Sequence, residues 1–485
     1  MIVGLGARYQ NYAHGFGCLC HSNIIMELTD RVSQSISRCS VLHGLMATMA
    51  AVGVGSSSAL AAENVDQPTV LKNIRIFNGR DAKLIEGKSL LIVKNRIENF
   101  IAANESIENA KIIDGGNRVL MPGMIDAHWH SILAAIPQMV AMTSDVAYIH
   151  LVAAQEAQRT LMRGFTTIRD VGGPSFALKR AIDEGRIVGP RIYPSGAMIS
   201  QTSGHGDFRL RTDVPRHSSN DLSLSEAAGI AAIADGEAEV LRRVREQLML
   251  GASQIKILVG GGVASTYDPF DSIQFTEAEI RAAVAAASDW GTYVCSHVYT
   301  SAGIQRALAC GVKSIEHGQL ADEETVKQIA DAGAWWSLQP FLADEDSNVY
   351  PTQIQRDQQK MVAQGTMRAF DLGQKYNVKM AWGTDILFNP KGTLTQGKQL
   401  AKIARWFDNA DVLKMATHTN AQLLAMSGPR NPYALPVGVI EAGAAADMLL
   451  VDGNPLEDIN LIADPDKNFK LIMKDGQVYK NELNT

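Results

Sequence analysis

The stretch Met121-Pro122-Gly123-Met124-Ile125-Asp126-Ala127-His128-Trp129-His130 is a short apolar run that ends in two histidines. A run of this length and composition predicts a buried strand. Because side chains alternate between the two faces of a strand, His128 and His130 would point to the same side. Two neighbouring imidazoles suit a metal ion, although an isolated H-x-H tripeptide is more often incidental. Whether this strand opens a metal site therefore depends on the residues that follow it.

Four more residues that can bind a metal stand inside or directly after later strand-like runs. They are Lys256 in Gln254–Val259, His297 after Tyr293–Ser296, His317 after Val312–Glu316, and Asp385 after Val378–Thr384. Taken singly, each is more often a hydrogen-bonded core or loop residue than a ligand. Taken together with the two histidines of the first strand, they predict a metal site.

Lys256 needs its own explanation, because apolar and β-branched residues surround it. A buried ammonium without a partner is costly. The ordinary solutions are a carboxylate partner, or a buried stem with the charged end in water. The alternative is a lysine that carries CO2 as a carbamate, whose anionic oxygens can bridge two metal ions.

Strand-like and helical stretches alternate from Met124 to Thr384, which predicts an α/β fold of the (β/α)8 TIM barrel type. The expected strands are Met124–His130, Phe165–Asp170, Arg191–Ser195, Gln254–Val259, Tyr293–His297, Val312–His317, Trp335–Leu338 and Val378–Thr384. A capping box at Thr276–Glu279 opens one expected helix, and Ser301–Ala309 and Asp322–Ala332 are two more that end at a glycine. Catalytic groups of such barrels lie at the C-terminal strand ends, where most of the candidate ligands stand.

Two short β-rich pieces flank the predicted barrel of residues 122–426. Residues 66–121 contain Leu90–Val93, a turn at Lys94-Asn95 and then Arg96-Ile97. Residues 427–485 contain Asp447–Val451 and a hairpin signal at Asp475-Gly476. Neither piece can bury a good core alone, so we expect one small β-sandwich built from both ends of the mature chain.

The composition is that of a soluble globular protein, with 46% hydrophobic and 20% charged residues. A formal net charge of −6 without a long basic run argues against nucleic acid as the main partner. After residue 66 no apolar stretch is long enough to span a bilayer.

Residues 1–62 have a different character. Arg31 and Arg38 precede the small-residue-rich run Val41–Leu60, which leads into Ala59-Leu60-Ala61. A charged flank, an apolar centre and an A-x-A ending predict a secretory signal peptide, here behind an upstream extension. The expected product is an exported, periplasmic enzyme without a membrane attachment after cleavage.

The order H-x-H, Lys, His, His and Asp on successive strands resembles the amidohydrolase superfamily with a binuclear metal centre. The resemblance covers nearly all of the chain after residue 66, including Gly260–Gly262 and the late segment Thr417–Ala421. The spacing of the ligands and the loop Gly204-His205-Gly206-Asp207 resemble prolidase-type amidases, a group that includes enzymes hydrolysing ochratoxin A.

This resemblance implies a specific set of ligands. His128, His130 and Asp385 would hold one divalent metal ion, and His297 and His317 the other, with a carboxylated Lys256 between them. Zinc suits a histidine-rich set best, although cobalt, manganese or iron are open. The resemblance also implies a homo-oligomer, with an octamer as one form.

It further implies how the residues act. A hydroxide between the metals would attack the scissile carbonyl, with Asp385 as general base and then general acid. His205 would hydrogen-bond the substrate or its oxyanion, or else face solvent as an ordinary loop histidine. Tyr299 would donate its hydroxyl to a substrate carboxylate or carbonyl, or else be structural.

The leading hypothesis is therefore an amide hydrolase that acts on a small molecule or dipeptide and releases a C-terminal amino acid, proline or phenylalanine. Lactone and phosphotriester hydrolysis remain open, because they use the same kind of centre. Deamination is the third alternative, although Val298-Tyr299-Thr300 stands where such deaminases carry a His-x-x-Glu motif. The fourth is a metal-binding scaffold without catalytic activity.

Overall fold

The structure, a computed structural model, describes residues 67–209, 222–265 and 267–483. Residues Val65–Thr485 form one compact unit. The predicted leader and its export signal lie outside the described residues. Among the residues that are described, no helix combines the length and the apolar character needed to cross a membrane.

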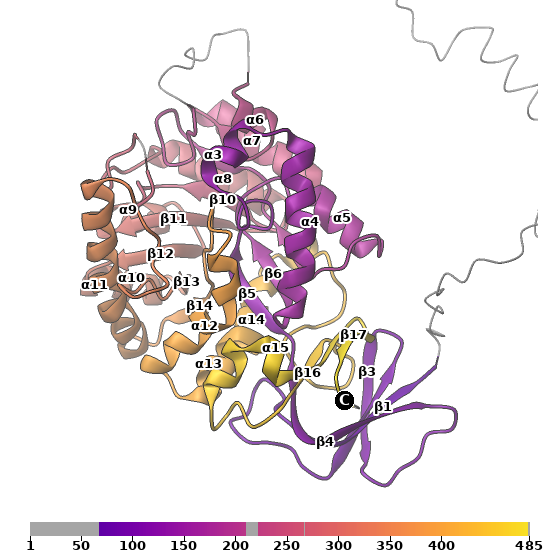
Figure 1. The fold of residues 1–485 in the computed structure, drawn as a ribbon. Coiled ribbons are helices and arrows are strands. Elements are labelled where there is room, and N and C mark those ends of the chain that lie inside the picture. The colour runs from indigo at the N-terminus through magenta and orange to yellow at the C-terminus, as the bar shows by residue number, and fades with distance from the viewer. Residues whose placement is uncertain (1–66, 210–221, 266, 484–485) are drawn as a thin grey trace, which may run out of the picture. The chain divides into compact units, whose positions relative to one another are not determined.

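Two parallel sheets contain all eight segments that the sequence predicts as barrel strands (Figure 1). The first sheet consists of β5 (Met124–Trp129), β6 (Phe165–Asp170) and β7 (Arg191–Pro194). The second has the order β14-β13-β12-β11-β10-β8-β9. Its strands are β8 (Met198–Ser200), β9 (Ala231–Ile233), β10 (Ile255–Leu258), β11 (Val294–Thr300), β12 (Ser314–Leu320), β13 (Trp335–Leu338) and β14 (Lys379–Trp382). The sequence did not predict β8 and β9, which are only three residues long.

Side chains join the two sheets where no strand pairing is present between the described strands. Asn420 Nδ2 donates to Ile125 O of β5 and to Trp382 O of β14, both at 2.8 Å. At the other junction Gln254 Nε2 donates to Asp170 O at 3.0 Å and to Tyr193 O at 2.9 Å. The Asn420 amide therefore keeps β5 and β14 side by side. The Gln254 amide does the same for β7 and β10.

Helices follow most of the parallel strands (Figure 1). They are α3 (Gln138–Thr143), α4 (Val146–Met162), α5 (Phe176–Asp183), α6 (Leu224–Ala227), α7 (Glu237–Leu250), α8 (Glu277–Asp289), α9 (Ser301–Ala309), α10 (Glu323–Asp331), α11 (Gln353–Lys375), α12 (Gln396–Ala401), α13 (Asn409–Lys414) and α14 (Asn420–Ala425). A further short helix, α15 (Pro465–Asn468), lies near the C-terminus. The predicted capping box is present, because Thr276 and Glu279 satisfy each other's backbone N–H groups. This arrangement confirms the α/β class, with parallel strands and intervening helices.

The two ends of the described chain build one further sheet, in the order β17-β16-β15-β4-β1-β2-β3. Its strands are β1 (Thr69–Ile76), β2 (Lys88–Val93), β3 (Arg96–Ala102), β4 (Lys111–Pro122), β15 (Met448–Val451), β16 (Phe469–Lys474) and β17 (Gln477–Asn481). The ends meet where β15 pairs antiparallel with β4, with Leu450 opposite Leu120. The predicted hairpin turn is present, with φ 53° at Asp475 and 72° at Gly476. Both ends of the described chain thus contribute strands to one sheet. A second layer, which would make this sheet a β-sandwich, stays a prediction.

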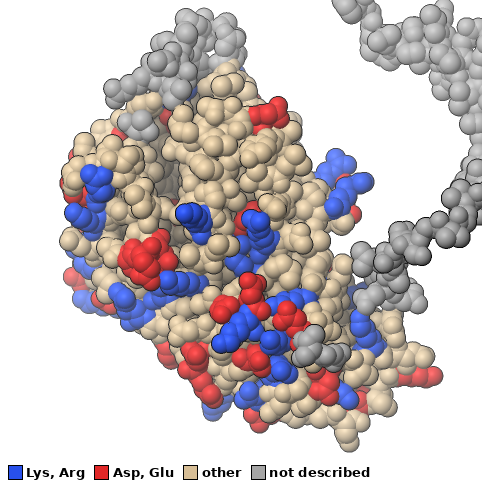
Figure 2. Space-filling view, viewed as in Figure 1, with Lys and Arg blue, Asp and Glu red and all other residues tan. Residues whose placement is uncertain are grey.

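Charged side chains of both signs are interspersed on the face shown in Figure 2, mainly over its lower half. Exposed ion pairs of the described residues include Lys398 with Glu345 at 2.9 Å and Arg281 with Glu277 at 3.3 Å. Each exposed pair of this kind adds little to stability. The fold therefore depends on its buried core, in which Trp336 and Trp382 are fully enclosed.

Candidate metal centre

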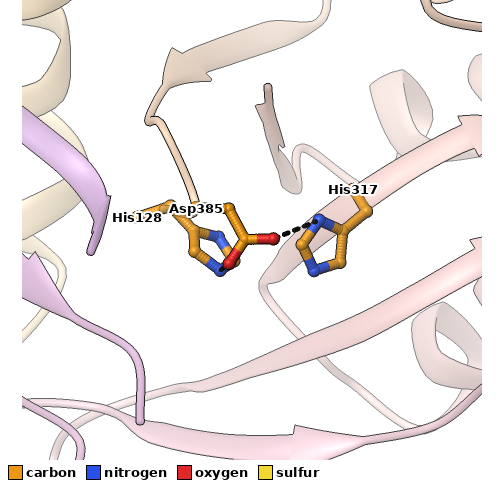
Figure 3. Close-up of side chains that lie close together, drawn as sticks. All are labelled: His128, His317 and Asp385. Atoms are coloured by element: carbon orange, nitrogen blue, oxygen red, sulfur yellow. Dashed lines mark ion pairs between the residues drawn. The ribbon is translucent and has the colours of Figure 1, made fainter. Parts of the chain in front are cut away.

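Residues from three strands, β5, β11 and β12, and from the segments after β5 and β14 converge on one point. His128 Nε2 and His130 Nε2 both lie 3.2 Å from Asp385 Oδ1. His317 Nδ1 lies 3.9 Å from Asp385 Oδ2. Figure 3 shows the Asp385 carboxylate between the rings of His128 and His317, and these three residues can offer ligand atoms within 4.8 Å of one another. The His297 ring lies 4.5 Å from the His317 ring, centre to centre.

The protonation of His128 and His130 follows from their neighbours. His128 Nδ1 is 2.8 Å from Glu316 Oε2, and His130 Nδ1 is 2.9 Å from Gly172 O. A carboxylate or carbonyl oxygen only accepts hydrogen bonds, so both Nδ1 atoms carry the hydrogen. In the neutral ring each Nε2 atom then keeps a lone pair, and both lone pairs face the same oxygen of Asp385. This arrangement is repulsive for neutral rings, and a cation bound between them would remove the repulsion.

His297 and His317 follow the same rule. His297 Nε2 donates to Gly261 O at 3.2 Å. His317 Nδ1 donates to Gln339 Oε1 at 2.8 Å, and the amide of Gln339 is oriented by its own donation to Ser337 O. All four histidines therefore donate one N–H to a protein acceptor and keep one nitrogen lone pair, which is the arrangement found in metal-ligating histidines.

The distances also fit a metal. Two ligands of a tetrahedral zinc ion, each 2.0 to 2.2 Å from it, lie roughly 3.3 to 3.6 Å apart, and the shortest bonds give the lower value. The 3.2 Å distances from Asp385 Oδ1 to His128 and His130 match this value. His128 Nε2 is also buried without a hydrogen-bond partner among the described residues. The residues present therefore fit a bound divalent cation.

Burial and mutual charge put these groups in the forms that bind a cation. Burial is the main cause that holds the pKa of His297 and of His317 well below its ordinary value. Burial alone would raise the pKa of Asp385, but the histidines around it, His128 foremost, outweigh burial and hold that pKa well below its ordinary value. His297 and His317 are therefore neutral imidazoles, and Asp385 is an ionised carboxylate, at neutral pH.

Lys256 lies on β10 and is 2% exposed. Within the described ranges no hydrogen bond holds its amine, and no carboxylate lies within 4.0 Å of it. Burial lowers its pKa, more strongly than Glu316 and Asp385 raise it. Lys256 therefore has neither a carboxylate partner nor a charged end in water. Its lowered pKa favours the uncharged amine, which is the form that reacts with CO2.

The strands that carry two of the histidines run further than the sequence predicts. β11 continues to Thr300 and β12 to Leu320, three residues beyond His297 and His317. The register shifts between Val298 and Thr300, and His317 has a φ of 72°. Asp385 has a φ of 52°. Positive φ at non-glycine residues costs free energy and concentrates at functional sites.

The structure places His205 against the centre. Its ring stacks on that of His297 with the centroids 4.2 Å apart and the planes at 15°. Its Nδ1 lies 2.7 Å from Ser265 Oγ and 3.6 Å from Asp268 Oδ2. A Cβ on Gly262 would fall 2.1 Å from the His205 ring, so the last glycine of the Gly260–Gly262 turn makes room for the ring. His205 is therefore held between Gly262 and His297.

Tyr299 also lies at the centre. Its ring stacks on that of His317, 5.0 Å between centroids and at 16°, and the residue is 4% exposed. It belongs to a small apolar cluster with Phe270, while Phe341 and Tyr350 pack against the cluster from the side. The sequence analysis missed these two aromatic residues, because the loop after β13 carries no motif.

Glu316 and Arg169 are completely buried beside the centre, and neither was predicted from the sequence. Arg169 Nη2 donates to both oxygens of Glu316 at 2.7 Å, and Glu316 in turn accepts the N–H of His128. The signal was available, since Glu316 is a charged residue inside an apolar strand. The reasoning that singled out Lys256 applies to it equally.

Comparisons with known proteins agree with this geometry. A model of the amidohydrolase family matches residues 119–479. Ochratoxinase of Aspergillus niger is 31% identical over 415 residues, which cover 80% of this chain and 82% of that protein.

Solved structures give the same result. A prolidase complexed with N-methylphosphonate-L-proline is 33% identical, with a TM-score of 0.78 over 86% of this chain and 100% of that chain. The crystal structure of A. niger ochratoxinase has 27% identity and a TM-score of 0.73, over 86% and 96% of the two chains. A Xaa-Pro dipeptidase with bound methionine has 28% identity and a TM-score of 0.74, over 86% and 100%.

The family match spans most of the chain and contains every histidine and carboxylate of the centre described above. The chain therefore belongs to the amidohydrolase family, in the group with the prolidases and ochratoxinase, and is a hydrolase of amide or peptide bonds.

Proposed function

We propose that the chain is a metal-dependent amidase that releases a C-terminal amino acid from Xaa-Pro or N-acyl-phenylalanine substrates. One observation carries the metal part of this proposal. Four buried histidines each donate one N–H to a protein acceptor, and two of them direct their remaining lone pairs at one carboxylate oxygen. The relatives named above support the choice of substrate.

In this proposal His128, His130 and Asp385 hold one divalent ion, His297 and His317 hold the other, and a carboxylated Lys256 lies between them. Zinc suits this set of nitrogen and oxygen donors. Cations bound here would act as Lewis acids toward a carbonyl oxygen and would make water more acidic. The buried amine of Lys256, which lacks a partner in the described ranges, supports the carboxylated form.

The side chains of the chain itself supply the remaining steps. Asp385 Oδ1 faces His128 and His130, which leaves Oδ2 to accept a proton from water and to return it to the departing amine nitrogen. His205 hydrogen-bonds the substrate, because its ring lies directly against His297. Tyr299, whose ring stacks on that of His317, donates its hydroxyl to the substrate carboxylate.

Ochratoxin A is a specific candidate substrate, with ochratoxin alpha and phenylalanine as products. The A. niger relative is named for this activity. The apolar cluster of Val263, Phe270, Tyr299 and Val362, with Phe341 and Tyr350 beside it, supports an apolar or aromatic substrate. Aromatic side chains contribute favourably to such contacts.

A substrate screen tests the proposal. The zinc-loaded protein is incubated with dipeptides, N-acyl amino acids, ochratoxin A, lactones and phosphotriesters, and the products are separated by mass. We expect release of proline or phenylalanine from the amides. Turnover confined to lactones or phosphotriesters would contradict the assignment.

Three further points complete the proposal. We propose that the two parallel sheets form one (β/α)8 barrel over residues 122–426, and that residues 66–121 and 427–485 form the small β domain. The chain is a homo-oligomer, with an octamer as one form. It is exported, and mass analysis of the mature protein should place its first residue near Ala62.

A further inference from the structure

The four histidines of the centre differ in what accepts their N–H group. His130 and His297 donate to backbone carbonyls, and His317 donates to the neutral amide of Gln339. Only His128 donates to a carboxylate, Glu316 Oε2, at 2.8 Å. A charged acceptor makes the stronger hydrogen bond and raises the basicity of the imidazole nitrogen that faces the metal.

Glu316 is itself held in place by a buried guanidinium. Arg169 Nη2 lies 2.7 Å from both carboxylate oxygens. Ser314 Oγ adds a third hydrogen bond at 2.6 Å to Oε1. Arg169 thus supplies the counter-charge that a buried carboxylate needs, in an ion pair with Glu316 at 2.7 Å.

The guanidinium connects several strands at once. Arg169 belongs to β6, and its Nε donates to Ala127 O of β5 at 2.6 Å. Its Nη1 lies 3.2 Å from the hydroxyl of Tyr293, the residue before β11. Glu316, on β12, thus has little freedom to move, and neither has the His128 ring that it orients.

We propose that Glu316, fixed by Arg169, is a positioning residue that makes the His128, His130 and Asp385 position bind its metal ion more tightly than the His297 and His317 position. This inference rests on the two-metal arrangement of the proposed function. It does not depend on the substrate. His297 and His317 donate their N–H groups to neutral acceptors, so no charged acceptor raises the basicity of their metal-facing nitrogens.

Metal retention tests the inference without any substrate. The zinc-loaded full chain, Glu316→Gln and Glu156→Gln are dialysed against increasing concentrations of a chelator, and bound zinc is measured by mass spectrometry. Glu156 is the matched control, since it forms a buried pair with Arg163 at 2.6 Å and has no contact with His128. The same samples loaded with Co2+ report the ligand field of each ion through visible absorption.

We expect the parent to lose its two ions in two separate steps. In Glu316→Gln the tighter ion should be lost at a 10- to 100-fold lower chelator concentration, with its Co2+ bands shifted, while the weaker ion is unaffected. Glu156→Gln should behave as the parent does. Retention equal to that of the parent in Glu316→Gln, or the same loss in Glu156→Gln, would overturn the inference.

Ser314→Ala provides a milder variant in case Glu316→Gln does not fold. It removes one hydrogen bond to Glu316 and should weaken the same ion to a smaller extent. Unchanged retention in Ser314→Ala, with Glu316→Gln unfolded, would count against the inference. A chain that shows two-step retention but hydrolyses no amide would contradict the proposed function alone.

Discussion

Single atoms decide what each residue of the metal centre can do. The Nδ1 hydrogens of His128 and His130 are fixed by Glu316 and Gly172, so both Nε2 lone pairs face Asp385. Sequence spacing predicted that these two histidines share one side of a strand. It did not predict their tautomers, because the acceptors come from other strands.

Lys256 provides the first test at this scale. Lys256→Met should leave fewer than two metal ions per chain and lower kcat by at least about 100-fold, because several kcal/mol of charge stabilisation are lost. Metal content by mass spectrometry and initial rates measure both effects. Lys474→Met is the control, since it removes another buried lysine that lies outside the centre. Full activity of Lys256→Met with two ions bound would refute the binuclear scheme.

Gly262 provides the second test. In Gly262→Ala the new Cβ would fall 2.1 Å from the His205 ring, so the ring must leave its present position against His297. We expect kcat to fall by roughly 10- to 100-fold, since a displacement of this size misplaces a catalytic group. Gly260→Ala is a matched control in the same turn, because its Cβ would meet nothing closer than 3.5 Å. Equal rates in the two variants would show that the position of His205 is unimportant.

At the scale of secondary structure, local signals fix the ends of the helices, and tertiary contacts fix the ends of the strands. The helices α8, α9 and α10 begin and end within one residue of the predicted limits, because caps and glycines act within a single turn. The ends of β11 and β12 were placed too early. Tertiary packing buries Tyr299 and so extends the strand beyond the polar histidine that appeared to end it.

The capping box of α8 allows a test at this scale. Thr276→Ala removes the hydroxyl that accepts from the N–H of Glu279 and should lower the free energy of unfolding by about 1 kcal/mol. Denaturant titration measures the difference. Thr276→Ser keeps the hydroxyl and should stay close to the parent. Rates of amide hydrolysis should be the same in all three proteins, because α8 begins outside the metal centre.

At the scale of the whole described unit, Arg191 joins the parallel sheets to the terminal sheet. Its Nε lies 3.0 Å from Asp447 Oδ2, and its Nη2 also pairs with Asp475 in the hairpin between β16 and β17. Burial would raise the pKa of Asp475, but Arg191 and then Lys474 outweigh it and lower that pKa below 3.8. The ionised carboxylate therefore stabilises the folded state.

The sign of this effect gives a pH prediction. A carboxyl with a lower pKa in the folded than in the unfolded chain stabilises the fold above its unfolded pKa, and this contribution is lost as the pH falls through the folded pKa. Asp475→Asn should therefore cost about 1 kcal/mol or less at pH 7, and this difference should shrink below pH 3.8. Unfolding by denaturant at pH 7 and at pH 3 checks it. Glu86→Gln, at an exposed position, controls for the loss of one negative charge.

Removing the metal provides a last test of the whole molecule. Dialysis against a chelator should abolish amide hydrolysis, and zinc should restore it. In the proposed mechanism the bound metal ions are what makes the water reactive and the carbonyl electrophilic. The metal-free chain should also unfold at lower denaturant concentration. Activity that survives complete removal of zinc would rule out a metal-dependent mechanism.

The sequence by itself determined the eight parallel strands, and it singled out His128, His317 and Asp385, whose ligand atoms lie within 4.8 Å of one another. The remaining ligands and the domain boundaries stay predictions. The strands and these three residues depend on periodicity, caps and residue type, all of which are local. Only the tertiary structure decided that Glu316 orients His128, that Asn420 and Gln254 join the sheets, and that His205 stacks on His297. Each of these contacts joins residues that lie far apart in the chain, so no local pattern could indicate them.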